Sequence, residues 1–202
     1  VGWIEELLWR DFYRHVMGGF PRVSRDRNFN TAYDGLLWRS SADDLAAWKA
    51  GRTGYPIVDA AMRCLLKTGW MHNRLRMIVA MFLTKHLLID WREGERHFMK
   101  HLVDADLGST NGGWQWRAST GTDAQPYFRI FNPTAQGEKF DPDGVFIRAW
   151  VEELSGVSGK AIHEPHKPAN KKVIGDLGGY IAPIVGQKEG RERALAVFKA
   201  HR

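Results

Sequence analysis

Apolar residues recur along this chain at the spacing of amphipathic helices. The clearest run covers residues 56–68, where Ile57, Ala60, Ala61, Cys64 and Leu65 fall on one helix face. A proline opens this run and a glycine follows it, as is typical of the first position and the end of a helix. The pattern therefore predicts a helix over residues 56–68.

The same spacing predicts helices over residues 3–17, 43–50, 75–87, 94–103, 143–154 and 187–200. No segment alternates in the manner of a strand bounded by hairpin turns. We expect Gly112-Gly113 to lie in a tryptophan-rich turn, and residues 155–186 to form a long irregular connection. The predicted fold class is all-α, with no boundary between domains.

Composition favours a globular protein that carries a positive charge. The chain has 202 residues, of which 44% are hydrophobic and 26% are charged, a balance typical of one folded domain. Lysine and arginine number 29 against 23 acidic residues, and the net charge of +6 favours weak, salt-dependent binding to nucleic acid. The nine tryptophans could fill the core or stack on exposed bases.

Several classes of protein are excluded by the sequence. The longest apolar run, Met77–Leu83, is too short to cross a membrane, and the first residues do not resemble a signal peptide. Cys64 is the single cysteine, so an internal disulfide is ruled out and a reducing compartment is favoured. We expect a cytoplasmic protein without a membrane partner.

Polar and aromatic residues gather on one face of the first predicted helix. Glu6, Arg10 and Tyr13 are spaced i, i+4 and i+7, with Trp9 beside them. An acid, a cation and aromatic rings on one face could hold a polar heterocycle. The alternative is an exposed face with one ion pair and a half-buried tryptophan.

Two further segments carry candidate chemistry. Arg74 and Arg76 lie at a predicted helix start and point to different sides of the helix, so that each could contact a different anion or simply be solvated. Asp104 and Asp106 could bind a metal ion, an arginine or the hydroxyl groups of a sugar. His97 and His101 have metal-compatible spacing, but Phe98 stands where the zinc-hydrolase motif requires glutamate. We therefore interpret these histidines as structural or surface residues and predict no metal site.

Six segments, in unbroken order, resemble the photolyase/cryptochrome family. They are Trp3–His15, Gly51–Arg63, Trp70–Met77, Asp90–Glu95, Asn111–Trp116 and Thr122–Pro133. The resemblance extends to about residue 165 and is closest to bacterial class I photolyases that repair cyclobutane pyrimidine dimers. Photolyases for the other major lesion carry two adjacent histidines where this chain has His72 and Asn73, together with a histidine near Met77.

The resemblance implies a folded flavin adenine dinucleotide (FAD) held between helices. The positions that match the family's cofactor contacts are Trp3, Glu6, Arg10, Asn73, Arg76, Asp104, Asp106 and Thr110. By resemblance, Arg76 and Asp104 form an ion pair at the isoalloxazine ring and favour the reduced, anionic flavin. Thr110 departs from the family, because photolyases of this type usually place asparagine opposite the flavin N5.

The resemblance also implies a substrate, namely DNA that contains a pyrimidine dimer. Trp9 and Trp116 match the aromatic clamp around the extruded dimer, and Glu6, Asn73 and Met77 match its other contacts. The positions that match contacts with DNA are Trp9, Arg10, Arg74, Trp116 and Arg129. The implied activity is that of a carbon–carbon lyase, which splits the dimer by light-driven electron transfer from reduced FAD.

A chain of three tryptophans is implied as well. Trp38, Trp91 and Trp114 match the family's relay that carries electrons from the surface to the flavin. Taken one at a time, each of them would be interpreted as a core tryptophan.

Family members begin with an α/β antenna domain, followed by helices and a loop that grips the flavin phosphates. We expect residues 1–202 to be the C-terminal portion of the FAD-binding, catalytic domain, without the means to bind an antenna chromophore. We also expect the chain to bind flavin weakly or not at all on its own, as a monomer or in association with the missing N-terminal part. The alternatives are a cryptochrome-type light sensor without repair activity and an inactive fragment.

Overall fold

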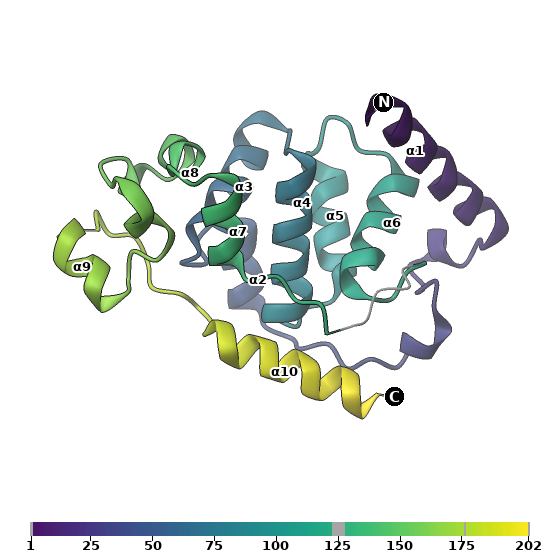
Figure 1. Ribbon diagram of the computed structural model, residues 1–202. Coiled ribbons are helices and arrows are strands. Elements are labelled where there is room, and N and C mark those ends of the chain that lie inside the picture. Colours follow the sequence, from purple (N-terminus) through teal and green to yellow (C-terminus); the bar gives the residue numbers. More distant parts are fainter. Residues whose placement is uncertain (1, 123–127, 176, 202) are drawn as a thin grey trace.

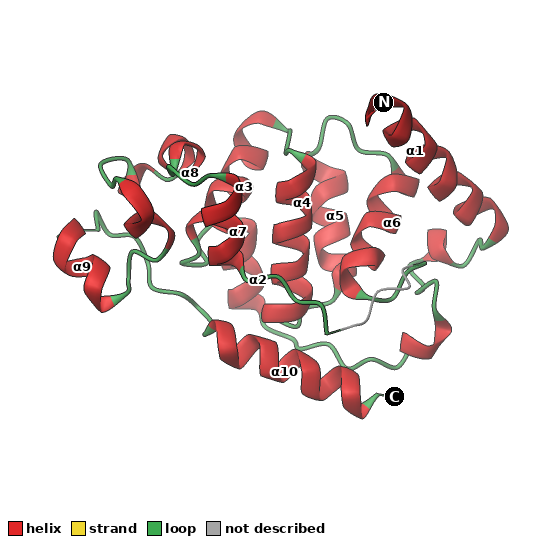
Figure 2. Ribbon diagram, viewed as in Figure 1, coloured by secondary structure: helices red, strands yellow, loops and turns green. Residues whose placement is uncertain are grey.

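The computed structural model describes residues 2–122, 128–175 and 177–201, and Figure 2 shows this part of the chain as helices joined by loops. Its α-helices are α1 (Gly2–Gly19), α2 (Ala42–Lys49), α3 (Pro56–Thr68), α4 (Asn73–Met81), α5 (Trp91–His101), α6 (Leu107–Ala118), α7 (Pro133–Phe140), α8 (Val145–Trp150), α9 (Pro168–Ile174) and α10 (Gln187–Ala200). Single turns of 3-10 helix cover Val23–Arg25, Thr31–Tyr33, Glu152–Leu154 and Gly159–His163, and a π-helical turn, Phe82–His86, continues α4. The predicted all-α fold is confirmed.

Several predicted helices agree closely with the observed ones. The bounds of α3 and α10 match the predictions, and α1, α2 and α5 differ from them by a few residues. The predicted turn at Gly112-Gly113 is wrong, because both glycines lie inside α6. The stretch 155–186 is not wholly irregular, since it contains α9, and α7 was not predicted at all.

Capping and close packing explain why residues 107–118 form a helix in spite of three glycines. The Asp106 carboxylate accepts a hydrogen bond from the Ser109 backbone N–H at 3.0 Å and caps the helix, which ends at Ser119 with a φ of 63°. A Cβ on Gly112 would lie 2.1 Å from the Tyr13 ring, so only glycine lets α1 approach α6 this closely. The opposite side of α6 packs in the same manner, because a Cβ on Gly94 of α5 would lie 2.1 Å from the Trp114 ring.

The central helices lie side by side and form one core (Figure 1). α3 is almost wholly buried and contacts α4, α7 and α8. α6 contacts α4 and α5, and α1 flanks its outer side. Because no residue of α1 is fully buried, the packing of this helix depends mainly on its contact with α6.

A buried carboxylate joins the turn before α3 to the segment before α10. Asp59 accepts hydrogen bonds from the Thr53 N–H at 2.7 Å, the Thr53 hydroxyl at 2.6 Å, the Gly54 N–H at 3.0 Å and the Tyr180 hydroxyl at 2.6 Å. Burial raises the pKa of Asp59, and the hydrogen bonds oppose that shift. Replacing Asp59 would leave these donors without an acceptor inside the core.

The last helix packs across the π-helical turn at one edge of the core. The Arg193 Nη2 donates to the His86 carbonyl at 2.6 Å, and Gly190 lies so close that a Cβ there would be 2.8 Å from the same oxygen. The Lys85 Nζ lies 3.5 Å from the centre of the Phe198 ring and donates to the Ala118 carbonyl at 3.1 Å. α10 therefore joins the C-terminal end of α6 to the end of α4.

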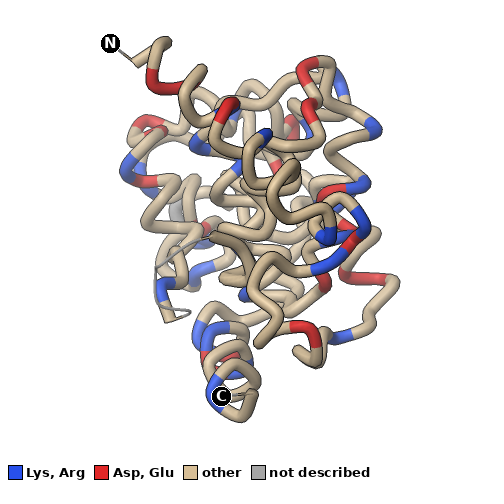
Figure 3. The backbone as a smooth tube through the Cα atoms, turned by 90° about the vertical axis from the view of Figure 1, so that its right-hand side faces the viewer, with Lys and Arg blue, Asp and Glu red and all other residues tan. Residues whose placement is uncertain are grey.

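Charges of both signs are interspersed over the backbone (Figure 3), so the positive net charge is not gathered on a single helix. Within residues 2–122, 128–175 and 177–201, no helix has the length and apolar character that a membrane span requires.

The packing of Gly112 generates a first prediction. We expect Gly112→Ala to lower the free energy of unfolding by about 1–3 kcal/mol, because its methyl group would overlap the Tyr13 ring. Chemical denaturation monitored by circular dichroism would measure the change. Gly113→Ala is the matched control, since a Cβ there meets no atom within 4 Å, and a helical alanine should raise the free energy of unfolding by up to about 1 kcal/mol. Equal effects of the two substitutions would contradict this account of α1 packing.

Two buried histidines generate a second prediction, on pH. Burial, followed by the Arg193 charge, lowers the pKa of His86 to about 4, and burial, followed by the His101 charge, lowers the pKa of His97 to about 4. In the unfolded chain these groups take up protons at a higher pH than in the folded chain. The free energy of unfolding should therefore fall as the pH drops from about 6.5 to about 4, by roughly 1–3 kcal/mol for each histidine.

Denaturation at a series of pH values would test this prediction. His97→Phe should make the pH dependence shallower in that window, whereas His15→Gln, at an exposed position of α1, should leave it unchanged. A dependence that is equally steep in His97→Phe and in the unchanged protein would overturn the prediction.

Candidate functional site

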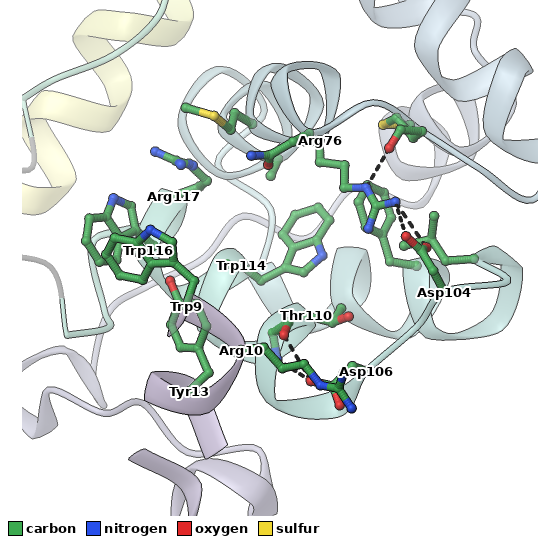
Figure 4. Close-up of a pocket in the computed structure, with 18 of the residues that line it drawn as sticks. Trp9, Arg10, Tyr13, Arg76, Asp104, Asp106, Thr110, Trp114, Trp116 and Arg117 are labelled. Carbon is green, nitrogen blue, oxygen red and sulfur yellow. Dashed lines mark hydrogen bonds and ion pairs between the residues drawn. The ribbon is translucent and has the colours of Figure 1, made fainter. Parts of the chain in front are cut away.

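A cavity of about 610 Å³ lies between α1, α4 and α6 (Figure 4). This volume falls within the range of about 300–1,000 Å³ that is typical of ligand and cofactor sites. α1 contributes Glu6, Trp9 and Arg10, and α4 contributes Asn73, Arg76 and Met77. The remaining predicted residues come from α6 and the loop before it, and they are Asp104, Asp106, Thr110, Trp114 and Trp116. The structure thus brings together residues that are up to 110 positions apart in the sequence, while their roles stay predictions.

Two tryptophans form a right-angled aromatic corner at one end of the cavity. The ring centres of Trp9 and Trp116 are 5.6 Å apart, and their planes are at 90°. On the α1 side the corner is extended by Tyr13, whose ring centre is 6.1 Å from that of Trp9, at an interplanar angle of 30°. A flat group with two joined rings could stack on one tryptophan while its edge meets the other.

A bidentate ion pair lies at the other end of the cavity (Figure 4). The Arg76 Nη2 donates to both carboxylate oxygens of Asp104, at 3.0 and 2.8 Å, and its Nε donates to the Met71 carbonyl at 2.7 Å. Both side chains remain partly accessible to solvent from the cavity. The pair therefore offers a cation of fixed orientation, and further donors and acceptors, to a polar ring.

Asp106 both caps α6 and lines the cavity. The Ser109 backbone N–H, followed by the Ser109 hydroxyl and Arg14, holds the pKa of Asp106 below its ordinary range. Arg14 Nη2 lies 3.4 Å from the Asp106 carboxylate. The carboxylate is consequently an acceptor that is well suited to hydroxyl groups of a ligand.

Trp114 and Thr110 occupy the middle of the cavity, between the ion pair and the aromatic corner (Figure 4). They lie four residues apart on α6, so their side chains follow one another along the helix. Trp114 is 2% exposed, and its ring centre lies 6.0 Å from that of Trp48 and 5.0 Å from that of Phe98. The ring is thus held in place by the core while its edge borders the cavity.

Three predicted contact residues lie away from this cavity. Trp3 is on α1 but is 76% exposed and does not line the cavity. The Arg74 guanidinium stacks on Phe140, 4.6 Å from the ring centre, on the side of α4 away from Arg76, as helix geometry predicted. Arg129 is exposed in the loop before α7. The matching segment Thr122–Pro133 is only partly visible, since residues 123–127 lie outside the described residues.

The remaining tryptophans of the predicted relay lie within the protein rather than at the cavity. Trp91 is fully buried, and its Nε1 donates to the Asn28 side chain at 2.9 Å. It precedes Gly94, which packs on Trp114, by one helical turn. Trp38 is half-buried, with its ring centre 6.3 Å from that of Phe198. The electron relay stays a prediction.

His97 and His101 lie on α5 and do not line the cavity. The His97 ring packs at 5.5 Å from Trp48 and at 4.2 Å from the His101 ring. Among residues 2–122, 128–175 and 177–201, no three His, Cys, Asp or Glu side chains are grouped as metal ligands would be.

One charged residue of the cavity, Arg117, was not predicted from the sequence. The apolar lining from Phe98 and Leu102 was not predicted either. The signal for Arg117 was its spacing of seven residues from Thr110 and one from Trp116, but that spacing has meaning only if this segment is a helix. Because Gly112-Gly113 was interpreted as a turn, this spacing did not indicate that Arg117 shares a face with Thr110.

Comparison with known proteins places this cavity in a family. Residues 3–200 match the family model described as the FAD binding domain of DNA photolyase. The deoxyribodipyrimidine photo-lyase of Escherichia coli is 59% identical over 200 residues, which are 99% of this chain and 42% of that protein. The chain therefore spans about two fifths of the length of this curated relative.

Solved structures agree with this result. A bacterial class III photolyase from Agrobacterium tumefaciens superposes with a TM-score of 0.92 at 49% identity, over 98% of this chain and 42% of that one. A cryptochrome from Synechocystis superposes with a TM-score of 0.87 at 36% identity, over 96% of this chain and 41% of that one. Both identities are high enough for the shared fold to reflect shared ancestry. The chain belongs to the family of the FAD binding domain of DNA photolyase.

Proposed function

We propose that this chain contributes residues that hold FAD, and the catalytic surface, for light-driven repair of cyclobutane pyrimidine dimers in DNA. One observation carries the proposal: a single cavity of about 610 Å³ contains both the residues expected to hold the flavin and those expected to hold the dimer. Electron transfer requires that donor and acceptor be close together. A cavity with an ion pair at one end and an aromatic corner at the other supports such an arrangement.

The residues at the ion-pair end fit a flavin. Arg76 is held by Asp104 and by the Met71 carbonyl, so its guanidinium would present a fixed positive charge to the electron-rich edge of the ring. Thr110 offers a hydroxyl that can donate or accept where the family usually offers an amide. Bound FAD would supply the light-absorbing group and the electron that opens the cyclobutane ring, and the electron returns after the two carbon–carbon bonds break.

The residues at the aromatic end fit an extruded pyrimidine dimer. A dimer stacks and pairs poorly, so its extrusion from the duplex costs less than that of a normal base. The perpendicular rings of Trp9 and Trp116 can contact two linked pyrimidines that are not coplanar. Glu6 lines the same cavity, and its carboxylate can accept a hydrogen bond from a pyrimidine imide N–H.

We also propose that residues 1–202 are the C-terminal portion of a FAD-binding, catalytic domain, in keeping with the share of the relatives that the chain spans. The exposed apolar residues of α1, among them Trp3 and Leu8, support this proposal, because a further segment packed on α1 would cover them. A cytoplasmic location and a monomeric state are part of the same proposal.

A light assay would test the proposed function. We expect the protein with reduced FAD to convert a dimer-containing oligonucleotide to its repaired form under blue light and not in the dark, which chromatography of the oligonucleotide would measure. Flavin photoreduction without repair would instead favour a cryptochrome-type sensor, a second candidate that the likeness to the Synechocystis protein supports. The absence of both reactions would favour an inactive fragment and contradict the proposal.

The aromatic corner generates a prediction on binding. We expect Trp116→Ala to weaken binding of a dimer-containing oligonucleotide by roughly 1–3 kcal/mol, because one stacking surface is lost. Fluorescence anisotropy in the dark would measure the dissociation constant. The undamaged oligonucleotide is the control, and its affinity should change little because its bases stay stacked. Equal losses for both oligonucleotides would contradict the assignment of Trp116 to the dimer.

A further inference from the structure

Arg117 is a charged residue of the cavity to which no role has been assigned. It is half-buried in the last turn of α6 and directly follows Trp116. Thr110, Gly113 and Arg117 are spaced i, i+3 and i+7, so they follow one another along a single helix face. Since Thr110 and Gly113 line the cavity, the helix geometry directs Arg117 to the cavity as well.

The position of Arg117 along the cavity differs from that of Arg76, Asp104 and Asp106. Figure 4 shows Arg117 on the same side of Trp114 as Trp9 and Trp116, whereas Asp104 and Asp106 lie on the other side. There, Arg76 is paired with Asp104, and Asp106 is occupied by Ser109 and Arg14. The cation that α6 contributes is therefore at the substrate end of the proposed site and not at the flavin end.

The proposed substrate has an anionic phosphate that this cation would contact. Two linked pyrimidines cannot enter the aromatic corner without the phosphate that joins their nucleotides. A guanidinium matches the geometry of a phosphate with two parallel N–H···O bonds. Partial burial reduces the screening of this interaction by salt, compared with a cation on the open surface.

We propose that Arg117 is a positioning residue that binds the phosphate between the two nucleotides of the extruded dimer. The interaction would fix the dimer against Trp9 and Trp116 at the correct depth, and it would favour a flipped dimer over a duplex that remains stacked. This inference rests on the proposed function. The interaction would involve the phosphate within the dimer and not the other phosphates of the DNA backbone.

Neutralising that phosphate tests the inference. The protein is used at its full natural length with FAD bound, in the dark, and is titrated with two dimer-containing oligonucleotides. One has a normal phosphate within the dimer, and the other has an uncharged methylphosphonate at the same place. We expect neutralisation to weaken binding to the unchanged protein roughly tenfold, the size of one charge-assisted hydrogen-bonded contact.

Substitutions complete the test. Arg117→Gln should bind the normal oligonucleotide roughly tenfold more weakly and should no longer respond to the methylphosphonate, and its slope of log K against log salt should be smaller by about 0.7–0.9. Arg117→Lys should regain part of the affinity and part of the response. Arg191→Gln makes the same change of charge at an exposed position of α10 and should behave as the unchanged protein does.

Three outcomes would overturn the inference. In the first, Arg117→Gln responds to the methylphosphonate as strongly as the unchanged protein. In the second, Arg117→Gln lowers the flavin absorbance while the affinity for DNA per bound flavin stays the same, which would assign Arg117 to the cofactor. In the third, the unchanged protein does not distinguish dimer-containing from undamaged DNA, and the proposed function then fails together with the inference. Dimer-selective binding in the first two cases leaves the proposed function intact.

Discussion

The close approach of helices to both sides of α6 is the constraint on which the cavity depends. On one side, Gly112 leaves room for the Tyr13 ring of α1, and on the other side Gly94 of α5 leaves room for Trp114. Each contact requires glycine, because a Cβ at either position would lie 2.1 Å from a ring carbon, much closer than van der Waals contact allows. The distance between α1 and α6 sets the separation of Trp9 and Trp116, and the contact with α5 fixes the orientation of Trp114.

Charge along α6 follows an order that agrees with the helix dipole. Asp106 caps the N-terminus of α6 and Arg117 lies in its last turn, and the dipole favours a carboxylate at the first place and a cation at the second. The end of the cavity near Asp106 is not purely acidic, because the Arg76–Asp104 ion pair lies there as well. That end therefore offers both donors and acceptors to a polar ring, whereas Arg117 contributes a cation at the end near Trp116.

Sequence patterns predicted α3, which has a continuous apolar face, and missed α6, which tertiary contacts stabilise. α3 has a proline at its start, a glycine in left-handed conformation after its end and a continuous apolar face, and its bounds were predicted correctly. α6 contains three glycines and several residues of low helix propensity, and its Gly112-Gly113 pair indicates a turn. Its formation depends on a cap from Asp106 and on the fit of Gly112 under Tyr13, which lies almost a hundred residues earlier in the chain. Local patterns carry no information on such a contact.

The same failure limited what could be predicted of the site. Glu6, Arg76 and Trp116 were carried over from the family resemblance, and all three line the cavity. The resemblance selected them although local patterns do not show how the helices pack. Trp3 does not line the cavity, since α1 is exposed on the side where Trp3 lies. Arg117 was missed because its direction follows only from treating residues 107–118 as a helix, and a turn would have left its side chain without a defined orientation. The direction of the Arg117 side chain therefore depends on the packing that makes residues 107–118 a helix, and local helix propensity does not indicate it.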